Sequence, residues 1–367
     1  MKNLVKKRKN LELKKKIWEE REWYVLRSIL GNDWAIFFFL VGGREAGKSY
    51  QVIKFYVAQY IIYGRPFYWL RLTEGSLEKL LKNNAEKLID PDIRRFFNIE
   101  TVRVGNDVYQ VTKRSKPDKN GKTRILEKKL MARVMAISTF YNDKGSGLFD
   151  NEFLNNPLMY YNICFDEMNR EQSERNTFDI VYNFTNQLEN LVRSTKKRIR
   201  VICIGNTLEE ASDLLCAFNF LPEKFGRYYL KKKRAVIEYI EPSEAYKKRR
   251  QGTIADILMP NASTFTNKIT VDDSLVYKGR LVKPAALIKF SKDNSHNFIL
   301  WDNNVIGCYH GETPPVKTPM YPYLDEVFNV KNRNNIIEIF DNRGYRYRDL
   351  ITFKKFQKEL TMLKATR

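Results

Sequence analysis

WAIFFFLVGGREAGKSYQVIKFYVAQYIIYG, residues 34–64, combines three patterns that together predict a fold. Residues 34–41 form an unbroken apolar run of strand length, a glycine-containing loop follows at once, and residues 49–64 place apolar side chains at helical spacing. The loop GGREAGKS, from Gly42 to Ser49, matches the pattern G-x-x-x-x-G-K-S in full. A strand, a glycine-rich loop and a helix in this order predict an α/β domain with a phosphate-binding loop.

The loop predicts a site for ATP with Mg²⁺. Its glycines let backbone N–H groups point at the β-phosphate, and the helix N-terminus adds positive potential. We expect Lys48 to reach the β- and γ-phosphates and Ser49 to offer its hydroxyl to Mg²⁺. Arg44 either stabilises charge on the phosphates of its own subunit or lies in solvent. The expected nucleotide contacts are Gly42, Gly43, Arg44, Glu45, Ala46, Gly47, Lys48, Ser49 and Tyr50.

Two further strands end in polar residues that suit such a site. NICFDE, residues 162–167, is an apolar strand that ends in Asp166 and Glu167. We expect Asp166 to assist Mg²⁺ and Glu167 to polarise the attacking water; the alternative is an ordinary strand capped by two surface acids. RIRVICIGN, residues 198–206, ends in Asn206, which either senses the γ-phosphate or simply caps a turn.

Basic residues elsewhere in this half are candidates for contacts outside the subunit. Arg193, Arg198 and Arg200 cluster before the strand that ends in Asn206, and one of them could be an arginine finger for a neighbour's γ-phosphate. Lys144, in the glycine-containing loop YNDKGSG, could contact a DNA phosphate. The alternative for each is a solvated surface.

The composition indicates a polyanionic partner. Sixty-five Lys and Arg against 43 Asp and Glu leave a formal net charge of +22, which favours nucleic acid over the alternatives of simple solubility or an anionic lipid surface. Four cysteines without close pairing and two histidines argue against a disulfide framework or a Cys/His zinc site, and a reducing cytoplasm fits. The basic N-terminus lacks a signal-peptide core, and no apolar run approaches membrane-spanning length.

The chain length predicts two domains. We expect an ATPase domain over residues 1–210, with an amphipathic lead-in helix at 11–30 and a β-hairpin insertion at 101–137. Strands alternating with helices predict a mainly parallel sheet in this domain. A linker region is expected over residues 211–250. A smaller, basic, β-rich domain is expected over residues 251–367, with short strands near 286–309 and a helix from 348 to 364.

The four motifs GGREAGKSY, FYWLR, ICFDEM and RIRVICIGN resemble, in order and spacing, those of the DNA-packaging motor ATPases of small tailed bacteriophages, the phi29-like encapsidation ATPases. The likeness covers roughly residues 34–210. It implies a RecA-like ASCE P-loop ATPase that forms a homo-oligomeric ring, usually a pentamer. It also implies that the ring acts in the host cytoplasm, transiently at the portal of an empty procapsid, and pumps double-stranded viral DNA inward. Whether a packaging RNA tethers the motor is left open.

The resemblance also implies roles for single residues. Lys48 and Ser49 match the Walker A positions, Asp166 and Glu167 the Walker B aspartate and catalytic glutamate, and Asn206 the coupling position. The trans-acting arginine maps to Arg193, with Arg198 next, because RSTKKRIR is one residue longer than the family's stretch. The second domain would be a degenerate RNase H-like, vestigial nuclease that holds nucleic acid, and its aspartates that could mimic two-metal carboxylates are Asp272, Asp273, Asp293 and Asp302.

Three other functions stay open at this point. A hexameric helicase-type translocase would separate strands without a capsid. A nuclease-competent large terminase would nick DNA in a Mg²⁺-dependent way. A DNA-binding scaffold with a dead nucleotide site is the third, and the intact Lys48, Asp166 and Glu167 argue against it.

Overall fold

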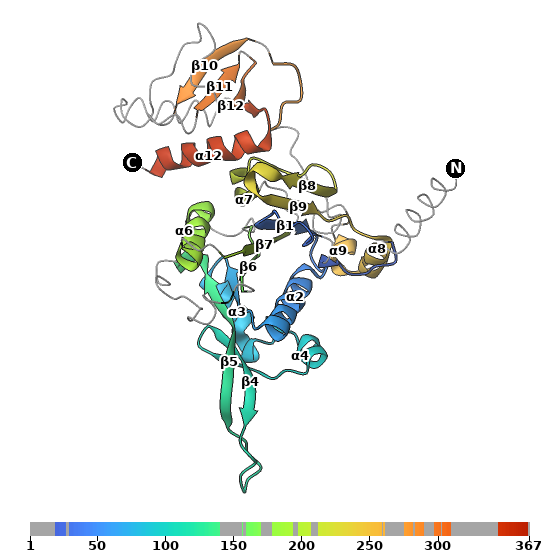
Figure 1. The fold of residues 1–367 in the computed structure, drawn as a ribbon. Coiled ribbons are helices and arrows are strands. Elements are labelled where there is room, and N and C mark those ends of the chain that lie inside the picture. Colours follow the sequence, from blue (N-terminus) through green and yellow to red (C-terminus); the bar gives the residue numbers. More distant parts are fainter. Residues whose placement is uncertain are drawn as a thin grey trace, which may run out of the picture. The chain divides into compact units, whose positions relative to one another are not determined.

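The computed structural model describes residues 19–26, 29–139, 156, 159–169, 178–193, 197–206, 212–258, 260, 275–281, 283–289, 297–301, 303–309 and 344–365. The chain divides into two compact units (Figure 1). The first unit contains residues 1–208 and 222–268, and the second contains residues 209–221 and 269–367. No helix among the described residues is long and apolar enough to cross a membrane.

A largely parallel sheet organises the first unit. Its described strands lie in the order β3-β4-β5-β2-β6-β7-β1-β9-β8. The central strands are parallel, and they are β2 (Phe67–Arg71), β6 (Tyr161–Asp166), β7 (Ile199–Asn206), β1 (Phe37–Gly42) and β9 (Ala235–Tyr239). Strand β7 lies between the strand that carries the glycine loop and the strand that ends in the acids. The predicted α/β class with a mainly parallel sheet is confirmed.

The central strands are apolar because both of their faces are covered. Every residue of β2 and β6 is buried, and aromatic rings supply much of the core, including Phe38, Trp69 and Phe165. Helix α2 (Lys48–Tyr63) buries Val52, Tyr56 and other residues of one face in this core. The helix begins after Gly47 and ends at Gly64, whose φ angles of 81° and 67° are left-handed and suit glycine.

The remaining helices of this unit connect the strands. They are α3 (Glu74–Ala85), entered through a capping box at Thr73, α4 (Pro91–Phe97), α6 (Ile180–Val192), α8 (Glu244–Arg250) and α9 (Ile254–Leu258). Because α6 links β6 to the parallel strand β7, it starts near the carboxyl edge of the sheet and ends near the amino edge.

One edge of the sheet is an antiparallel hairpin, as predicted for residues 101–137. Strand β3 (Thr101–Val104) pairs with β4 (Asp107–Arg114), and β4 pairs with β5 (Ile125–Ala136). The inner half of β5 joins the main sheet by pairing in parallel with β2.

The other edge differs from the sequence-based expectation. Residues 211–250, expected as a linker region, contribute β8 (Gly226–Leu230) and β9, which extend the sheet beyond β1. The basic residues Lys231–Lys233 form a 3-10 turn (η3) between these strands, with Arg234 in the left-handed region. Strand β9 is buried against β1, so residues 222–250 belong to the first unit, whereas residues 211–221 belong to the second.

The second unit is smaller and β-rich, as expected. Strands β10 (Pro284–Lys289), β11 (Asn297–Trp301) and β12 (Val305–Tyr309) are antiparallel, and β13 (Arg346–Tyr347) pairs in parallel with β12. Helix α12 (Leu350–Ala365) packs Phe356 and Leu360 into the core of this sheet, and α7 (Asp213–Ala217) lies against it. Its expected likeness to a nuclease stays a prediction. The lead-in helix expected over residues 11–30 is wrong for residues 20–26 and 29–30, which form turns and irregular backbone because Tyr24 N bonds to Ala46 O and Leu26 and Ile29 pack into the core of the first unit; residues 11–18 and 27–28 lie outside the described residues.

Candidate functional site

The glycine loop between β1 and α2 borders a pocket of about 460 Å³ at the carboxyl edge of the sheet. The motif folds here because β1 is buried and delivers Gly42 to this edge, and because Gly47 turns the chain into α2. The pocket brings together residues from the ends of β1, β6 and β7. They are Arg44, Glu45, Ala46, Gly47, Lys48, Ser49, Tyr50, Asp166, Glu167, Ile204 and Asn206.

Lys48 is held inside the loop. Its Nζ donates to the carbonyl oxygens of Gly42 at 2.8 Å and Gly43 at 2.6 Å, and its side chain is almost fully buried. Burial lowers the pKa of Lys48 to about 8, although Asp166 opposes this and Arg44 adds to it. Burial destabilises the charged form of this ammonium group. The negative charge of a phosphate in the adjoining pocket would stabilise it.

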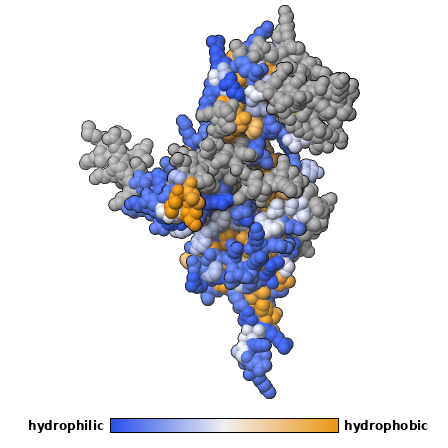
Figure 2. Space-filling view, turned by 180° about the vertical axis from the view of Figure 1, so that it is seen from behind, coloured by the Kyte–Doolittle hydropathy of each residue, from blue (hydrophilic) through white to orange (hydrophobic). Residues whose placement is uncertain are grey.

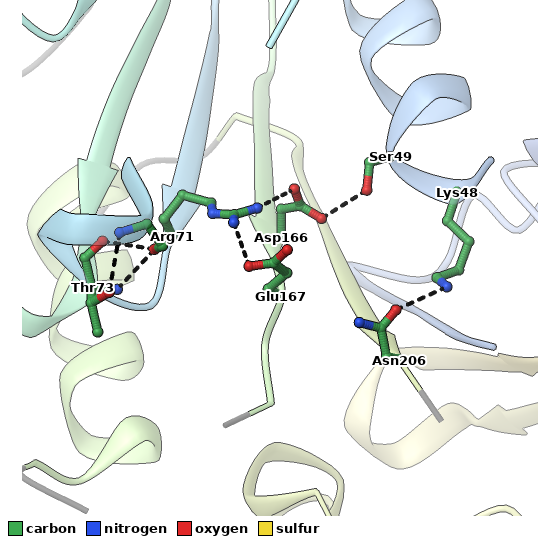
Figure 3. Close-up of polar contacts among 8 residues, drawn as sticks. Lys48, Ser49, Arg71, Thr73, Asp166, Glu167 and Asn206 are labelled. Atoms are coloured by element: carbon green, nitrogen blue, oxygen red, sulfur yellow. Dashed lines mark hydrogen bonds and ion pairs between the residues drawn. The ribbon is translucent and has the colours of Figure 1, made fainter. Parts of the chain in front are cut away.

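Ser49 and Asp166 meet across two elements, as the motif reading predicts. Ser49 Oγ, on the first turn of α2, donates to Asp166 Oδ1 at the end of β6 over 2.8 Å (Figure 3). Mg²⁺ in triphosphate sites keeps most of its water and takes only one or two protein oxygens. A hydroxyl and a carboxylate oxygen at hydrogen-bond distance beside the loop therefore fit such an ion.

Arg71, the last residue of β2, joins the two acids and was missed by sequence reasoning. Its Nη1 donates to Asp166 Oδ2 at 2.7 Å, and its Nη2 pairs with Glu167 Oε2 (Figure 3). The Arg71 side chain is 10% exposed, Asp166 is 7% exposed, and Glu167 is 53% exposed. Because β2 and β6 are neighbours, the guanidinium reaches both carboxylates from the adjacent strand end. The only sequence signal is a charged residue that ends an otherwise apolar strand.

Glu167 is the residue directly after β6. It adopts φ 56°, uncommon for a residue other than glycine. Its carboxylate borders the pocket but is paired with Arg71. A water-activating role therefore requires Glu167 to share or release that ion pair.

Asn206 lies where the sequence places it, at the end of β7. Its Cα is in register with Gly42, and its Oδ1 lies 3.5 Å from Lys48 Nζ. The amide oxygen of Asn206 therefore faces the lysine that we expect to reach the γ-phosphate.

Arg44 borders the pocket with an exposed side chain, and the backbone around it is braced from behind. The Arg44 carbonyl accepts from Tyr246 Oη at 2.8 Å and from Arg250 Nη1 at 3.1 Å. The Glu45 carbonyl accepts from Arg249 Nη2 at 2.7 Å, and the Arg249 guanidinium lies 3.6 Å from the Trp23 ring centre.

The ring of Trp23 also backs Gly47, where a Cβ atom would meet it at 3.1 Å, and Tyr24 N donates to Ala46 O at 2.8 Å. Sequence reasoning placed α8 in a linker and missed this bracing role. The motif loop is thus supported by a basic helix whose residues lie about two hundred positions further along the chain.

The three arginines around the start of β7 have different environments. Arg200 is buried, donates to Tyr160 Oη at 3.0 Å and packs on Phe55, so it belongs to the core. Arg198 pairs with Asp33 at 2.6 Å. Arg193 ends α6 with an exposed side chain that has no hydrogen-bond or ion-pair partner among the described residues. Because α6 ends at the amino edge of the sheet, Arg193 lies at the opposite edge from its own pocket.

Five predicted contacts cannot be placed. Lys144, Asp272, Asp273, Asp293 and Asp302 lie outside the described residues. Within the described part of the chain, no cluster of three or more His, Cys, Asp or Glu side chains could hold a metal ion.

Comparison with known proteins identifies relatives among phage packaging proteins. The DNA packaging protein of Bacillus phage PZA is 24% identical over 190 residues, which are 52% of this chain and 48% of that protein. The DNA packaging protein of Bacillus phage B103 is 23% identical over 226 residues, which are 60% of this chain and 59% of that protein. The chain thus spans about half the length of the curated relatives it matches. No protein-family model matches it.

Solved structures extend the likeness to the fold of nearly the whole chain. A chain of the bacteriophage phi29 viral genome packaging motor assembly superposes with a TM-score of 0.60 at 20% identity, covering 94% of this chain and 99% of that one. The phi28 DNA packaging motor gives a TM-score of 0.60 at 15% identity, with 94% and 98% covered. At these identities the likeness shows a shared fold. The predicted resemblance to phi29-like packaging proteins is confirmed.

Proposed function

We propose that this chain is a Mg²⁺-dependent P-loop ATPase that drives double-stranded viral DNA through the portal into a procapsid. The observation that carries the ATPase part is the 2.8 Å hydrogen bond between Ser49 Oγ and Asp166 Oδ1. It joins the lysine-bearing loop to the acidic strand, which is where Mg²⁺ and the β- and γ-phosphates would be held together. When bound, Mg²⁺ would neutralise charge on the transferring phosphoryl group.

The chain's own side chains divide the remaining work. Lys48 exchanges its bonds to the Gly42 and Gly43 carbonyls for bonds to phosphate oxygens, and Arg44 adds positive charge at the mouth of the pocket. Glu167, which shares Arg71 with Asp166, orients the attacking water. Asn206 lies next to Lys48 and reports the state of the terminal phosphate to β7.

The arginine that completes the site comes from a neighbouring subunit in this proposal. Arg193 lies at the opposite edge of the sheet from its own pocket, and the described residues offer it no partner. A homo-oligomeric ring, a pentamer by resemblance, would bring it to the next subunit's γ-phosphate. The first unit would be the ATPase and the second would hold nucleic acid, in the host cytoplasm at the procapsid portal.

The decisive experiment separates nucleotide binding from turnover. Wild type, Lys48→Ala and Glu167→Gln are assayed for binding of a fluorescent ATP analogue and for hydrolysis with and without duplex DNA and Mg²⁺. We expect wild type to hydrolyse ATP faster with DNA and to stop in EDTA. Glu167→Gln should bind ATP but hydrolyse at least about 100-fold more slowly, because a general base contributes on the order of 10²–10⁴-fold. Lys48→Ala should lose binding.

The transport part needs a separate readout. Purified procapsids, the chain, ATP and viral DNA are incubated, and DNA that resists DNase is measured. Wild type should protect DNA and Glu167→Gln should not. A wild-type chain that hydrolyses ATP with DNA but unwinds a forked substrate and protects no DNA would replace packaging with a helicase function.

A further inference from the structure

A basic hairpin projects from the first unit, formed by the outer parts of β4 and β5 and the turn at residues 115–124 (Figure 1). Strand β5 pairs with the main sheet only from Ala132 onward, so the outer residues of the hairpin pair only with each other. Residues 116–129 are all exposed. A two-stranded ribbon alone is at best marginally stable in water, so this projection contributes little to the fold.

The hairpin carries a dense, unbalanced positive charge. Residues 113–129 contain eight Lys or Arg and two acids, Asp118 and Glu127. Arg114 pairs with Glu100, and Lys128 lies over the ring of Tyr109 at 4.6 Å. Among the described residues, no ion pair neutralises the other cations of this stretch, which are Lys113, Lys116, Lys119, Lys122, Arg124 and Lys129. Figure 2 shows the end of the projection, at the bottom of the view, as mainly hydrophilic.

The end of the hairpin has a defined shape. Asp118 Oδ1 accepts from the backbone N of Asn120 at 2.9 Å and of Lys122 at 2.8 Å. Ser115 Oγ accepts from Arg124 N at 2.9 Å, and Ser115 N donates to Arg124 O at 2.8 Å. One of the two acids therefore shapes the turn instead of neutralising a lysine. The turn keeps several cations close together despite their mutual repulsion, which an external polyanion would relieve.

We propose that this hairpin is a docking arm for double-stranded DNA, which it holds through the phosphate backbone. Closely spaced phosphates suit several cations on one short ribbon, and the major groove of B-form DNA, about 12 Å wide, admits a two-stranded ribbon. Because β5 runs inward parallel to β2, the turn lies beyond the amino edge of the sheet, whereas the ATP pocket lies at the carboxyl edge. The arm is separate from the catalytic site and rests on the proposed function only for the source of the duplex.

The test compares two triple variants of the full chain. Lys116→Gln, Lys119→Gln and Lys122→Gln remove three charges from the arm and leave the Asp118 and Ser115 hydrogen bonds intact. Lys79→Gln, Lys82→Gln and Lys87→Gln remove three exposed charges from or just after α3 and serve as the matched control. Binding of labelled 30-base-pair DNA and RNA duplexes is measured by fluorescence anisotropy over a series of salt concentrations, and basal ATPase is measured on the same preparations.

We expect the arm variant to bind the DNA duplex about tenfold more weakly at 0.1 M salt, and its salt slope to fall by about 2–3, since each phosphate contact contributes about 0.9. The control should change binding less than twofold, and basal ATPase should be unchanged in both. Weakening confined to the RNA duplex would contradict the assignment to DNA.

Equal affinity of the two variants for the DNA duplex overturns the proposal. This holds even if the arm variant binds an acidic procapsid protein more weakly. If wild type shows no basal ATPase activity, the proposed function is refuted, and the binding test of the arm still stands.

Discussion

Arg71, at the end of β2, holds both carboxylates at the end of β6: its Nη1 lies 2.7 Å from Asp166 Oδ2, and its Nη2 pairs with Glu167. Two adjacent carboxylates beside a triphosphate would repel each other and the ligand unless a cation shares them. The guanidinium supplies that charge in a fork that addresses both acids. Arg71 therefore sets the position of the acid that assists Mg²⁺ and of the acid that activates water.

Removing Arg71 should harm stability and turnover together. Arg71→Ala leaves the buried Asp166 without its cation, and breaking a buried ion pair costs about 3–5 kcal/mol. We expect a clear drop in thermal midpoint and nearly complete loss of ATPase activity. Arg71→Lys keeps the positive charge but not the forked guanidinium. Compared with Arg71→Ala, it should therefore restore the thermal midpoint more than the ATPase activity. Arg95→Ala, which breaks a pair with side chains 78% and 64% exposed, should change the free energy of unfolding by at most about 1 kcal/mol.

The sequence predicts the parts of this site that lie in one short motif or directly after a recognisable strand. Gly42–Ser49 is a contiguous motif, and Asp166, Glu167 and Asn206 follow apolar strands, so parallel strand ends bring them together. Arg71 ends the strand motif FYWLR, but nothing in that motif assigns the arginine a role. Its role depends on β2 being the neighbour of β6, and strand order is set by long-range packing that a single sequence does not display.

The same limit explains the missed edge of the sheet. Strand β8 is only partly buried, and a run of three lysines with Arg234 in the left-handed region makes the turn where glycine or asparagine would have marked a hairpin. The charge run resembles a linker. Burial of β9 against β1 decides the structure, and that contact joins residues about two hundred positions apart.

The depressed pKa of Lys48 predicts how stability changes with pH. An unfolded chain keeps a lysine proton up to about pH 10.4, whereas the folded chain releases this one at about pH 8. Between these values the unfolded state binds more protons, so raising the pH stabilises the folded state. The free energy of unfolding of nucleotide-free wild type should therefore rise from pH 8 to 10 relative to Lys48→Met, measured by urea denaturation. The two pH profiles should run parallel below pH 7. Parallel profiles over the whole range would show that Lys48 titrates as an ordinary lysine.

Complementation between two inactive variants tests whether Arg193 is the arginine finger. Arg193→Ala alone should lose at least about 100-fold in ATPase activity, since such fingers are worth on the order of 10³–10⁵-fold. Mixed with Lys48→Ala subunits, it should regain activity, because some interfaces then combine an intact pocket with an intact finger. Arg200→Ala is the contrast: Arg200 is buried against Tyr160 and Phe55, so its loss should lower the thermal midpoint without complementation. Normal hydrolysis by homomeric Arg193→Ala would end this assignment.

The brace behind the glycine loop makes a prediction about affinity. Arg249 Nη2 donates to the Glu45 carbonyl at 2.7 Å and its guanidinium stacks on Trp23, which in turn backs Gly47. Without this support the loop would be less ordered before the nucleotide binds. Binding would then have to order the N–H groups that point at phosphate, and this lowers the affinity. Arg249→Ala should raise the dissociation constant for ATP about tenfold, measured by calorimetry, with little effect on turnover of bound ATP. Lys247→Ala, on the same helix but paired only with Glu244 among the described residues, is the matched control and should bind as wild type. If both substitutions weaken binding equally, the effect comes from the charge of α8 on the phosphates and not from the contact with the loop.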